Sequence, residues 1–118
     1  MVLYCAADLL WATRIKSTAD ALGVPCRPAR NEQMLRDRLG DSPVRALIVD
    51  LESADGPGLI GVVRSLTPPG SVRVVAFGPH DATEALMDAR AAGADSVMTR
   101  GAFSARLADL IRDLGGQS

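Results

Sequence analysis

The sequence predicts an α/β domain with one five-stranded parallel sheet, doubly wound, with helices on both faces. Short apolar runs alternate along the 118 residues with longer stretches whose apolar residues recur at helical spacing. This alternation is typical of parallel sheets whose crossover connections are right-handed. The run Val44–Leu51 is apolar almost continuously, which indicates a strand buried on both faces. A chain of this length is expected to form one domain, residues 1–118.

The five expected strands are short apolar runs bounded by glycine, proline or charged residues. They are Val2–Ala6, Pro25–Ala29, Val44–Leu51, Val72–Phe77 and Ser96–Thr99. The second run contains Pro25 and Pro28, and proline has no N–H to donate to a neighbouring strand. This strand is therefore expected at an edge of the sheet, or not at all.

The five expected helices combine helical spacing with recognisable start or stop residues. They are Asp8–Gly23, Glu32–Leu39, Gly58–Leu66, Asp81–Gly93 and Phe103–Gly115. Asn31 can cap the second helix, which is expected to end at Gly40. Asp81 and Glu84 have the spacing of a capping box at the start of the fourth helix, and Gly93 can close that helix.

The composition argues against several classes of function. The net charge is −1 and the lysines and arginines form no cluster, unlike those of a nucleic-acid binder. The apolar runs are too short to span a bilayer. Asp8 and Arg14 interrupt the first apolar stretch, unlike a secretory signal, so the protein is expected in the cytoplasm. Cys5 and Cys26 are then expected to stay reduced and to act as small buried hydrophobes.

Three segments stand out near the carboxyl ends of the expected strands. "ALIVDLESADGPGL" (Ala46–Leu59) ends an apolar strand on an aspartate, and "VRVVAF" (Val72–Phe77) leads into a helix. "ARAAGADSVMTR" (Ala89–Arg100) contains an Ala-Gly-Ala-Asp run, Ala92–Asp95, before the last strand. With these segments the chain resembles, over essentially its whole length, the receiver domain of bacterial two-component response regulators. The resemblance implies a receiver/flavodoxin-like fold with a functional crevice at the carboxyl ends of the strands.

The resemblance implies that Asp50, at the end of the third strand, is the candidate phosphoacceptor. Receivers hold Mg²⁺ with a pair of acidic residues at the end of the first strand, and Ala6 and Ala7 stand at those positions. Mg²⁺ prefers oxygen ligands in octahedral geometry. Without the acidic pair, Asp50 is left with at most the carbonyl of Glu52, so no metal ion or other cofactor is expected.

Three further positions depart from the family. Gly78 stands where receivers have a Ser or Thr, and Val97 where they have a Tyr or Phe. Arg100 and Gly101 replace a Lys-Pro pair. With the metal absent, the Arg100 guanidinium could take the Asp50 carboxylate through two hydrogen bonds, or it could point into solvent.

Two acidic residues leave alternatives open. Asp8 directly follows the alanines and could reach the site after a shift of one or two residues, or it could cap the first helix. Glu52 could lean toward Asp50 or stay exposed in the loop. The one histidine, His80, has no nucleophile or carboxylate partner in the sequence, so no catalytic residue is expected.

These features favour a non-catalytic, receiver-like signalling module without a phosphorylation switch. No output domain fits within 118 residues, so any effect is expected to pass through a protein partner, such as a histidine kinase or another signalling protein. The alternative is a functional single-domain response regulator that is phosphorylated on Asp50 with Mg²⁺ in an atypical site. A third class is a small-molecule-binding domain, because the crevice of this fold is generic.

The resemblance also implies a surface for a homodimer, because receivers commonly associate through their fourth helix, fifth strand and fifth helix. The mixed charges on the fourth and fifth helices here could pair reciprocally across a two-fold axis, or they could simply be solvated. The charged residues are Glu84, Asp88, Arg90, Arg106, Asp109, Arg112 and Asp113.

Overall fold

Five strands form one parallel sheet in the order β2-β1-β3-β4-β5. The computed structural model describes residues 1–52 and 55–115, so residues 53 and 54 of the first family-like segment lie outside it, as do residues 116–118. The strands are β1 Val2–Cys5, β2 Cys26–Pro28, β3 Ala46–Asp50, β4 Arg73–Gly78 and β5 Ser96–Thr99. The chain adds β2 on one side of β1 and the later strands on the other side, so the sheet is doubly wound. Strand β2 lies at an edge of the sheet, as predicted.

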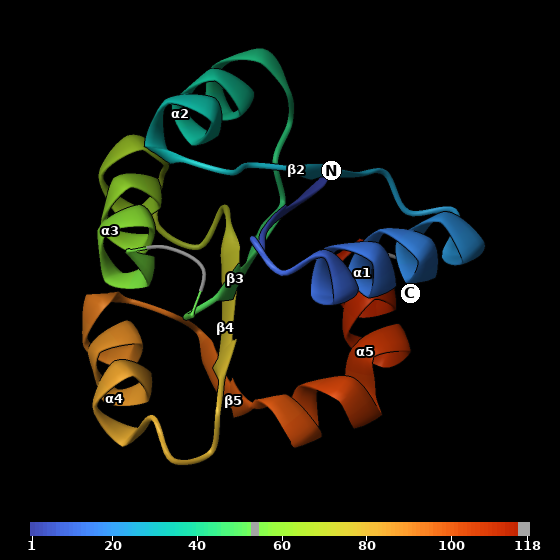
Figure 1. The fold of residues 1–118 in the computed structure, drawn as a ribbon. Coiled ribbons are helices and arrows are strands. Elements are labelled where there is room, and N and C mark those ends of the chain that lie inside the picture. Colours follow the sequence, from blue (N-terminus) through green and yellow to red (C-terminus); the bar gives the residue numbers. More distant parts are fainter. Residues whose placement is uncertain (53–54, 116–118) are drawn as a thin grey trace.

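Helices cover both faces of this sheet (Figure 1). They are α1 Leu9–Leu22, α2 Glu32–Asp41, α3 Gly56–Leu66, α4 Thr83–Ala92 and α5 Arg100–Leu114. Helices α1 and α5 pack on one face, and α2, α3 and α4 pack on the other. The predicted fold class is confirmed. No helix within the described ranges has the length and apolar character needed to cross a membrane.

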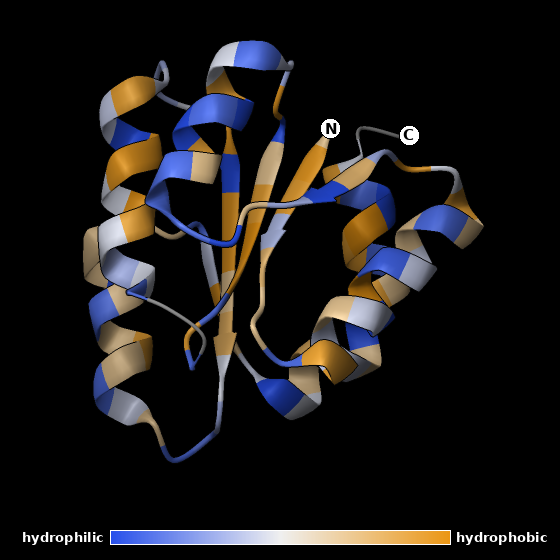
Figure 2. Ribbon diagram, turned by 45° about the horizontal axis from the view of Figure 1, so that its top comes forward, coloured by the Kyte–Doolittle hydropathy of each residue, from blue (hydrophilic) through white to orange (hydrophobic). Residues whose placement is uncertain are grey.

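The central strands are largely apolar along their length (Figure 2), and their side chains are buried in a core on each face of the sheet. The face under α1 and α5 carries a buried aromatic cluster formed by Trp11, Phe77 and Phe103. The Phe77 and Phe103 rings are stacked, with centroids 4.0 Å apart. The Trp11 ring lies 5.0 Å from Phe77 and 5.6 Å from Phe103. Because Phe77 pairs in register with Asp50, this cluster borders the predicted crevice.

The ends of two helices show how local capping works in this chain. Asp8 caps α1, because its Oδ1 accepts a hydrogen bond from a backbone N–H of the first turn at 2.8 Å. Gly23 closes α1 in the left-handed conformation, with φ 72°. Helix α5 begins earlier than predicted, because the Thr99 hydroxyl accepts a first-turn N–H at 3.2 Å. Arg100 is therefore the first residue of a helix and not the last residue of a strand.

The capping box predicted for α4 is wrong. The helix begins at Thr83 after Ala82, and no side chain caps it. The Ala82 N–H donates to the Pro79 carbonyl at 3.0 Å, which closes a turn before the helix. This turn places Asp81 one residue too early to serve as the N-cap. The reciprocal capping hydrogen bonds between Asp81 and Glu84 therefore do not form.

Two other helix boundaries also differ from the prediction. Helix α2 continues through Gly40 and ends at Asp41, because a glycine inside a helix costs only about 1 kcal/mol. Helix α3 begins at Gly56, before the expected start at Gly58. The Asp55 side chain explains this earlier start, since its Oδ1 accepts the Gly58 N–H at 3.1 Å and caps the helix.

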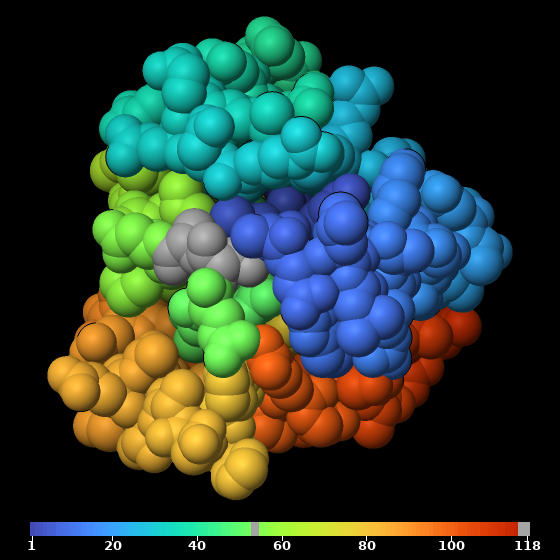
Figure 3. All heavy atoms as spheres, viewed as in Figure 1, coloured from blue at the N-terminus to red at the C-terminus, as the bar shows by residue number. Residues whose placement is uncertain are grey.

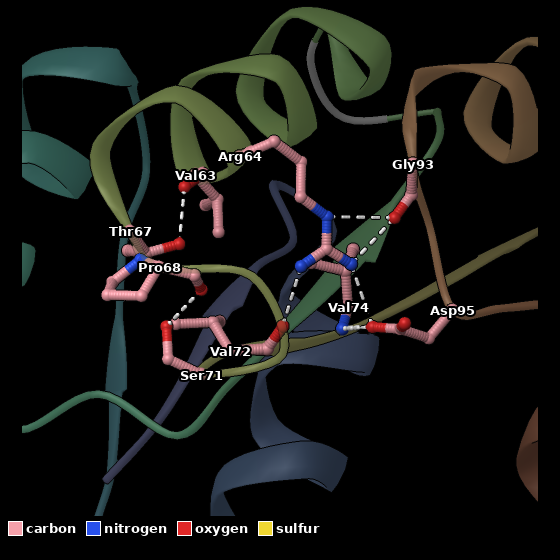
Figure 4. Close-up of polar contacts among 9 residues, drawn as sticks. All are labelled: Val63, Arg64, Thr67, Pro68, Ser71, Val72, Val74, Gly93 and Asp95. Carbon is pink, nitrogen blue, oxygen red and sulfur yellow. Dashed lines mark hydrogen bonds and ion pairs between the residues drawn. The ribbon is translucent and has the colours of Figure 1, made fainter.

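The guanidinium of Arg64 in α3 ties together the segments around β4 and β5 (Figure 4). It donates twice to the Gly93 carbonyl, at 3.0 and 2.6 Å. It also donates to the Val72 carbonyl at 2.8 Å and to Asp95 Oδ2 at 2.8 Å. The same carboxylate oxygen accepts the Val74 N–H at 2.8 Å. These contacts explain the Ala-Gly-Ala-Asp run: Gly93 has φ 114° directly against the Arg64 side chain, and Asp95 anchors β4.

We predict that Asp95 makes the stability of the fold depend on pH. Burial by itself raises the pKa of this carboxyl, but the hydrogen bonds from Val74 N–H and Arg64 outweigh burial and hold the pKa below its ordinary value. Such a carboxyl stabilises the fold fully above its unfolded-state pKa of about 3.9, and this contribution is lost as the pH falls through the folded-state pKa. Asp95→Asn should therefore be less stable than the wild type near pH 7, by a margin that shrinks below about pH 4.

Urea unfolding of the wild type and Asp95→Asn at several pH values measures this margin. Asp113→Asn is the matched control, because Asp113 is exposed on α5 and this substitution should leave the stability nearly unchanged at every pH. A margin for Asp95→Asn that stays constant down to about pH 2 would contradict the prediction.

Candidate functional site

Asp50 is the last residue of β3, and its side chain is fully buried. Alternation along the strand places it on the same face as Ile48, under α1 and α5. Its Oδ1 accepts a hydrogen bond from the Glu52 N–H at 3.0 Å, which holds the turn that follows the strand. The structure thus places a buried carboxylate at the carboxyl end of the central strand, where the crevice is predicted.

The two cysteines are free and buried, as predicted. Burial raises the pKa of the Cys5 thiol, and the nearby charge of Asp50 raises it further. Burial also raises the pKa of Cys26, to about 11. Both thiols therefore stay protonated at neutral pH, and neither is an activated nucleophile.

Arg100 forms an ion pair with Glu52, whereas one hypothesis from the sequence was a pair between Arg100 and Asp50. The Arg100 side chain is 34% exposed and that of Glu52 is 51% exposed, so this ion pair lies at the rim of the crevice. Asp50 is fully buried, and burying the Arg100 guanidinium beside it would cost free energy because the cation would lose its hydration. Arg100 Nε is buried and has no hydrogen-bond partner within the described residues.

The end of β1 presents small side chains to the crevice. Ala6 is half-buried and Ala7 is exposed. Asp8, which follows them, uses its Oδ1 to cap α1. Of the two alternatives for Asp8, the structure therefore shows the helix cap.

Gly78 ends β4 and pairs in register with Thr99. A Cβ atom at Gly78 would lie 3.5 Å from Leu51 Cβ and 3.7 Å from Leu86 Cδ2, which are ordinary van der Waals distances. The fold therefore leaves room for the first atom of a side chain here, and the missing hydroxyl is a property of this sequence. Val97 packs with the cluster under α2, α3 and α4, on the opposite side of the sheet from Asp50.

Comparisons with known proteins agree with this geometry. No protein-family model matches the sequence. No curated protein matches it either. A response regulator from Thermotoga maritima has the same fold, with a TM-score of 0.78 at 16% identity, over 98% of this chain and 97% of that chain. A signal receiver domain from Bermanella marisrubri gives a TM-score of 0.78 at 21% identity, over 96% and 95% of the two chains.

A third similar structure is the receiver domain of Saccharomyces cerevisiae Ssk1, crystallised with the histidine phosphotransfer signalling protein Ypd1. Its TM-score is 0.79 at 15% identity, over 98% of this chain and 88% of that chain. The chain has the receiver fold. At these identities the likeness establishes the architecture, and the function has to be argued from the site.

The crevice of this receiver fold offers few free oxygen ligands for Mg²⁺. Asp8 is used as a helix cap, and the Glu52 carboxylate is paired with Arg100. Across the described ranges, no three His, Cys, Asp or Glu side chains gather closely enough to hold a metal ion. Mg²⁺ in proteins is usually anchored by one or two carboxylates in a near-ideal octahedron. The ligands around Asp50 therefore do not fit the metal that the family implies.

Beside this crevice, the receiver fold of this chain contains a cavity of about 440 Å³ that the sequence did not predict. It is lined by Tyr4, Cys5, Ala6, Ala7, Leu9, Ala12 and Arg30. Tyr4 and Arg30 belong to no motif, and the fold alone brings Arg30, two residues after β2, close to the start of α1. The only signal in the sequence is a tyrosine within the otherwise apolar first strand.

Proposed function

We propose that this chain is a receiver-like signalling module that binds a protein partner and is not switched by phosphorylation of Asp50. The observation that carries the proposal is the pair of alanines, Ala6 and Ala7, at the end of β1. In the receivers that this chain resembles, acidic residues at these positions hold Mg²⁺. Methyl groups supply no oxygen ligand, so Asp50 has no acidic neighbour there with which to share a cation.

Phosphoryl transfer depends on positioning and charge neutralisation, and the metal ion supplies much of both. The loss of one stabilising contact costs roughly ten- to a thousandfold in rate. Here Gly78 also lacks a hydroxyl, and the Arg100 guanidinium is engaged by Glu52. These features together support a site that does not accept a phosphoryl group at a useful rate, and a protein without catalytic residues.

The proposed signal passes through contact with another protein. The Ssk1 receiver domain was crystallised with a histidine phosphotransfer protein. A histidine kinase or another signalling protein is the corresponding partner proposed for this chain. We place the protein in the cytoplasm, where its two free, buried cysteines would stay reduced.

A homodimer through α4 and α5 is a second proposed interaction. Glu84, Arg90 and Arg106 are exposed on these helices, and opposite charges could pair across a two-fold axis. Arg112 is already paired with Asp109 inside α5, at 3.0 Å, so it has less to offer a second copy. Size-exclusion chromatography with light scattering reports the oligomeric state directly.

The alternative function is that of a working response regulator with Mg²⁺ in an atypical site. The observation that favours it is Asp50 itself, a buried carboxylate at the end of β3, where receivers carry their phosphoacceptor. Under this alternative the protein would take a phosphoryl group from a small donor or from a histidine kinase.

Incubation with Mg²⁺ and acetyl phosphate, followed by intact mass spectrometry, separates the two functions. We expect no added phosphoryl group, because the acidic pair and the hydroxyl are absent. A receiver domain with a complete acidic pair is the positive control. A phosphoryl adduct that forms on the wild type and disappears in Asp50→Asn would replace the proposed function with the alternative.

A further inference from the structure

The cavity beside β1 lies between the end of that strand, the first turns of α1 and Arg30, two residues after β2. Its volume of about 440 Å³ falls within the roughly 300–1,000 Å³ of small-molecule sites in proteins. In Figure 3 the dark blue atoms of the first strand are visible between blue α1 and the cyan segment after β2. Such a position, at the carboxyl ends of parallel strands, is where ligands bind in folds of this kind.

Most of the wall is apolar. Ala6 and Ala12 contribute only methyl groups, and Leu9 stands at the mouth with 81% of its surface exposed. An exposed leucine at the start of a helix gains by being covered, because burying apolar surface is favourable by about 25 cal/mol per Å². The small residues at the end of β1 thus do more than remove a metal site, since longer side chains there would occupy part of this space.

Two polar side chains line the cavity, and the polar groups at their ends are not used in hydrogen bonds or ion pairs among the described residues. The Arg30 guanidinium makes no hydrogen bond or ion pair within the described residues. The Tyr4 hydroxyl likewise has no hydrogen-bond partner in the described part of the chain, while the residue as a whole is 8% exposed and packs in the core under α1 and α5. Among the described residues that line the cavity there is no carboxylate.

Charges of both signs act on the Tyr4 phenol, and Arg30 is the cation among them that lines the cavity. Burial raises the pKa of the Tyr4 phenol, and the charges of Lys16 and Arg30 oppose that effect, so both cations act on the phenol. Lys16 is already paired with Asp20 at 3.0 Å. This leaves Arg30 as the lining cation that can receive an anionic ligand, and a guanidinium binds a carboxylate through two parallel hydrogen bonds.

We propose that this cavity binds a small organic acid whose carboxylate contacts Arg30 and the Tyr4 hydroxyl while its apolar body packs against Ala6, Leu9 and Ala12. A ligand of this class would enter beside the crevice and contact the end of β1, next to Asp50. The site goes beyond the proposed function, and the two can fail independently, because ligand binding requires neither phosphorylation nor a protein partner.

Titration with octanoate, followed in ¹H–¹⁵N NMR spectra, tests the proposal. We expect saturable shifts for the amides of Ala6, Ala7 and Ala12, with an affinity in the millimolar range or tighter. Arg30→Gln should weaken binding about tenfold or more, because it removes charge-assisted hydrogen bonds. Arg27→Gln is the matched control: Arg27 is an exposed arginine on β2 that does not line the cavity, so octanoate should bind this variant as it binds the wild type.

Two further arms test the apolar and the anionic parts of the ligand separately. Ala6→Leu should weaken octanoate binding by filling the cavity, and 1-octanol should bind about tenfold or more weakly than octanoate because it carries no charge. The proposal is overturned if octanoate produces no saturable shifts at these alanines. It is also overturned if Arg30→Gln and Arg27→Gln bind octanoate alike, or if 1-octanol binds as tightly as octanoate.

Discussion

Replacing Phe77 by alanine is expected to lower the free energy of unfolding by about 4 kcal/mol. The side chain is fully buried and stacks on Phe103 with ring centroids 4.0 Å apart. It also contacts Trp11, whose ring lies at 5.0 Å. The loss combines the removed apolar surface with the cavity left behind and the lost ring stacking. Domains of this size are stable by only about 5–15 kcal/mol in total, so the variant should unfold at a much lower urea concentration.

Urea unfolding monitored by circular dichroism measures this loss. Phe77→Leu is the graded variant, because leucine keeps most of the apolar volume and should cost less than alanine. Met87→Ala is the matched surface control: Met87 is 66% exposed on α4 and should change stability by about 0.5 kcal/mol or less. A loss below about 1 kcal/mol for Phe77→Ala would mean that the aromatic cluster does not pack as described.

The second large effect is expected for Arg64→Ala, which should lower the free energy of unfolding by about 3 kcal/mol. Its guanidinium makes four hydrogen bonds to three acceptors, and its side chain is 28% exposed. Without it, the carbonyls of Val72 and Gly93 lose their charged donor. The Asp95 carboxylate loses its cation in the same step.

Arg64→Lys separates geometry from charge. A lysine keeps the positive charge but cannot reproduce the planar fork that reaches three acceptors, so this variant should recover less than half of the loss. Arg36→Ala is the matched control, because Arg36 pairs only with Glu32 one helical turn away, in an exposed position. That control should cost about 0.5 kcal/mol or less, and an equal cost for Arg64→Ala would contradict the role given to this residue.

These two predictions concern opposite ends of the sheet, because Phe77 borders the candidate site and the partners of Arg64 lie before and at the start of β4 and β5. Phe77 lies in register with Asp50, and Arg64 holds the segment that leads into β5. Arg100, the first residue of α5, follows β5 directly and carries the ion pair at the rim of the crevice. The aromatic cluster therefore forms part of the crevice wall, whereas the Arg64 contacts hold β4 and β5 together at the end away from the crevice.

The sequence predicted the elements well where the signal is local. Ser96–Thr99 was predicted with its observed bounds, and Gly23 closes α1 as expected. Asp8 caps α1, which is one of the two alternatives that the sequence left open. Caps and apolar periodicity act over a few residues, so they can be recognised without knowing the fold. The same reasoning failed at Asp81, because the turn before α4 sets where the helix begins.

By itself, the sequence determined the doubly wound α/β architecture, the place of Asp50 at the end of a buried strand and the absence of an acidic pair beside it. The first two depend on residue type and on periodicity along the chain, and the third depends on the resemblance to receivers, which says where an acidic pair would stand. Only the tertiary structure decided that Arg100 pairs with Glu52 and that Arg30 and Tyr4 line one cavity. Such pairings join residues far apart in the chain, and burial and distance select them among many charged candidates. No local pattern carries that information.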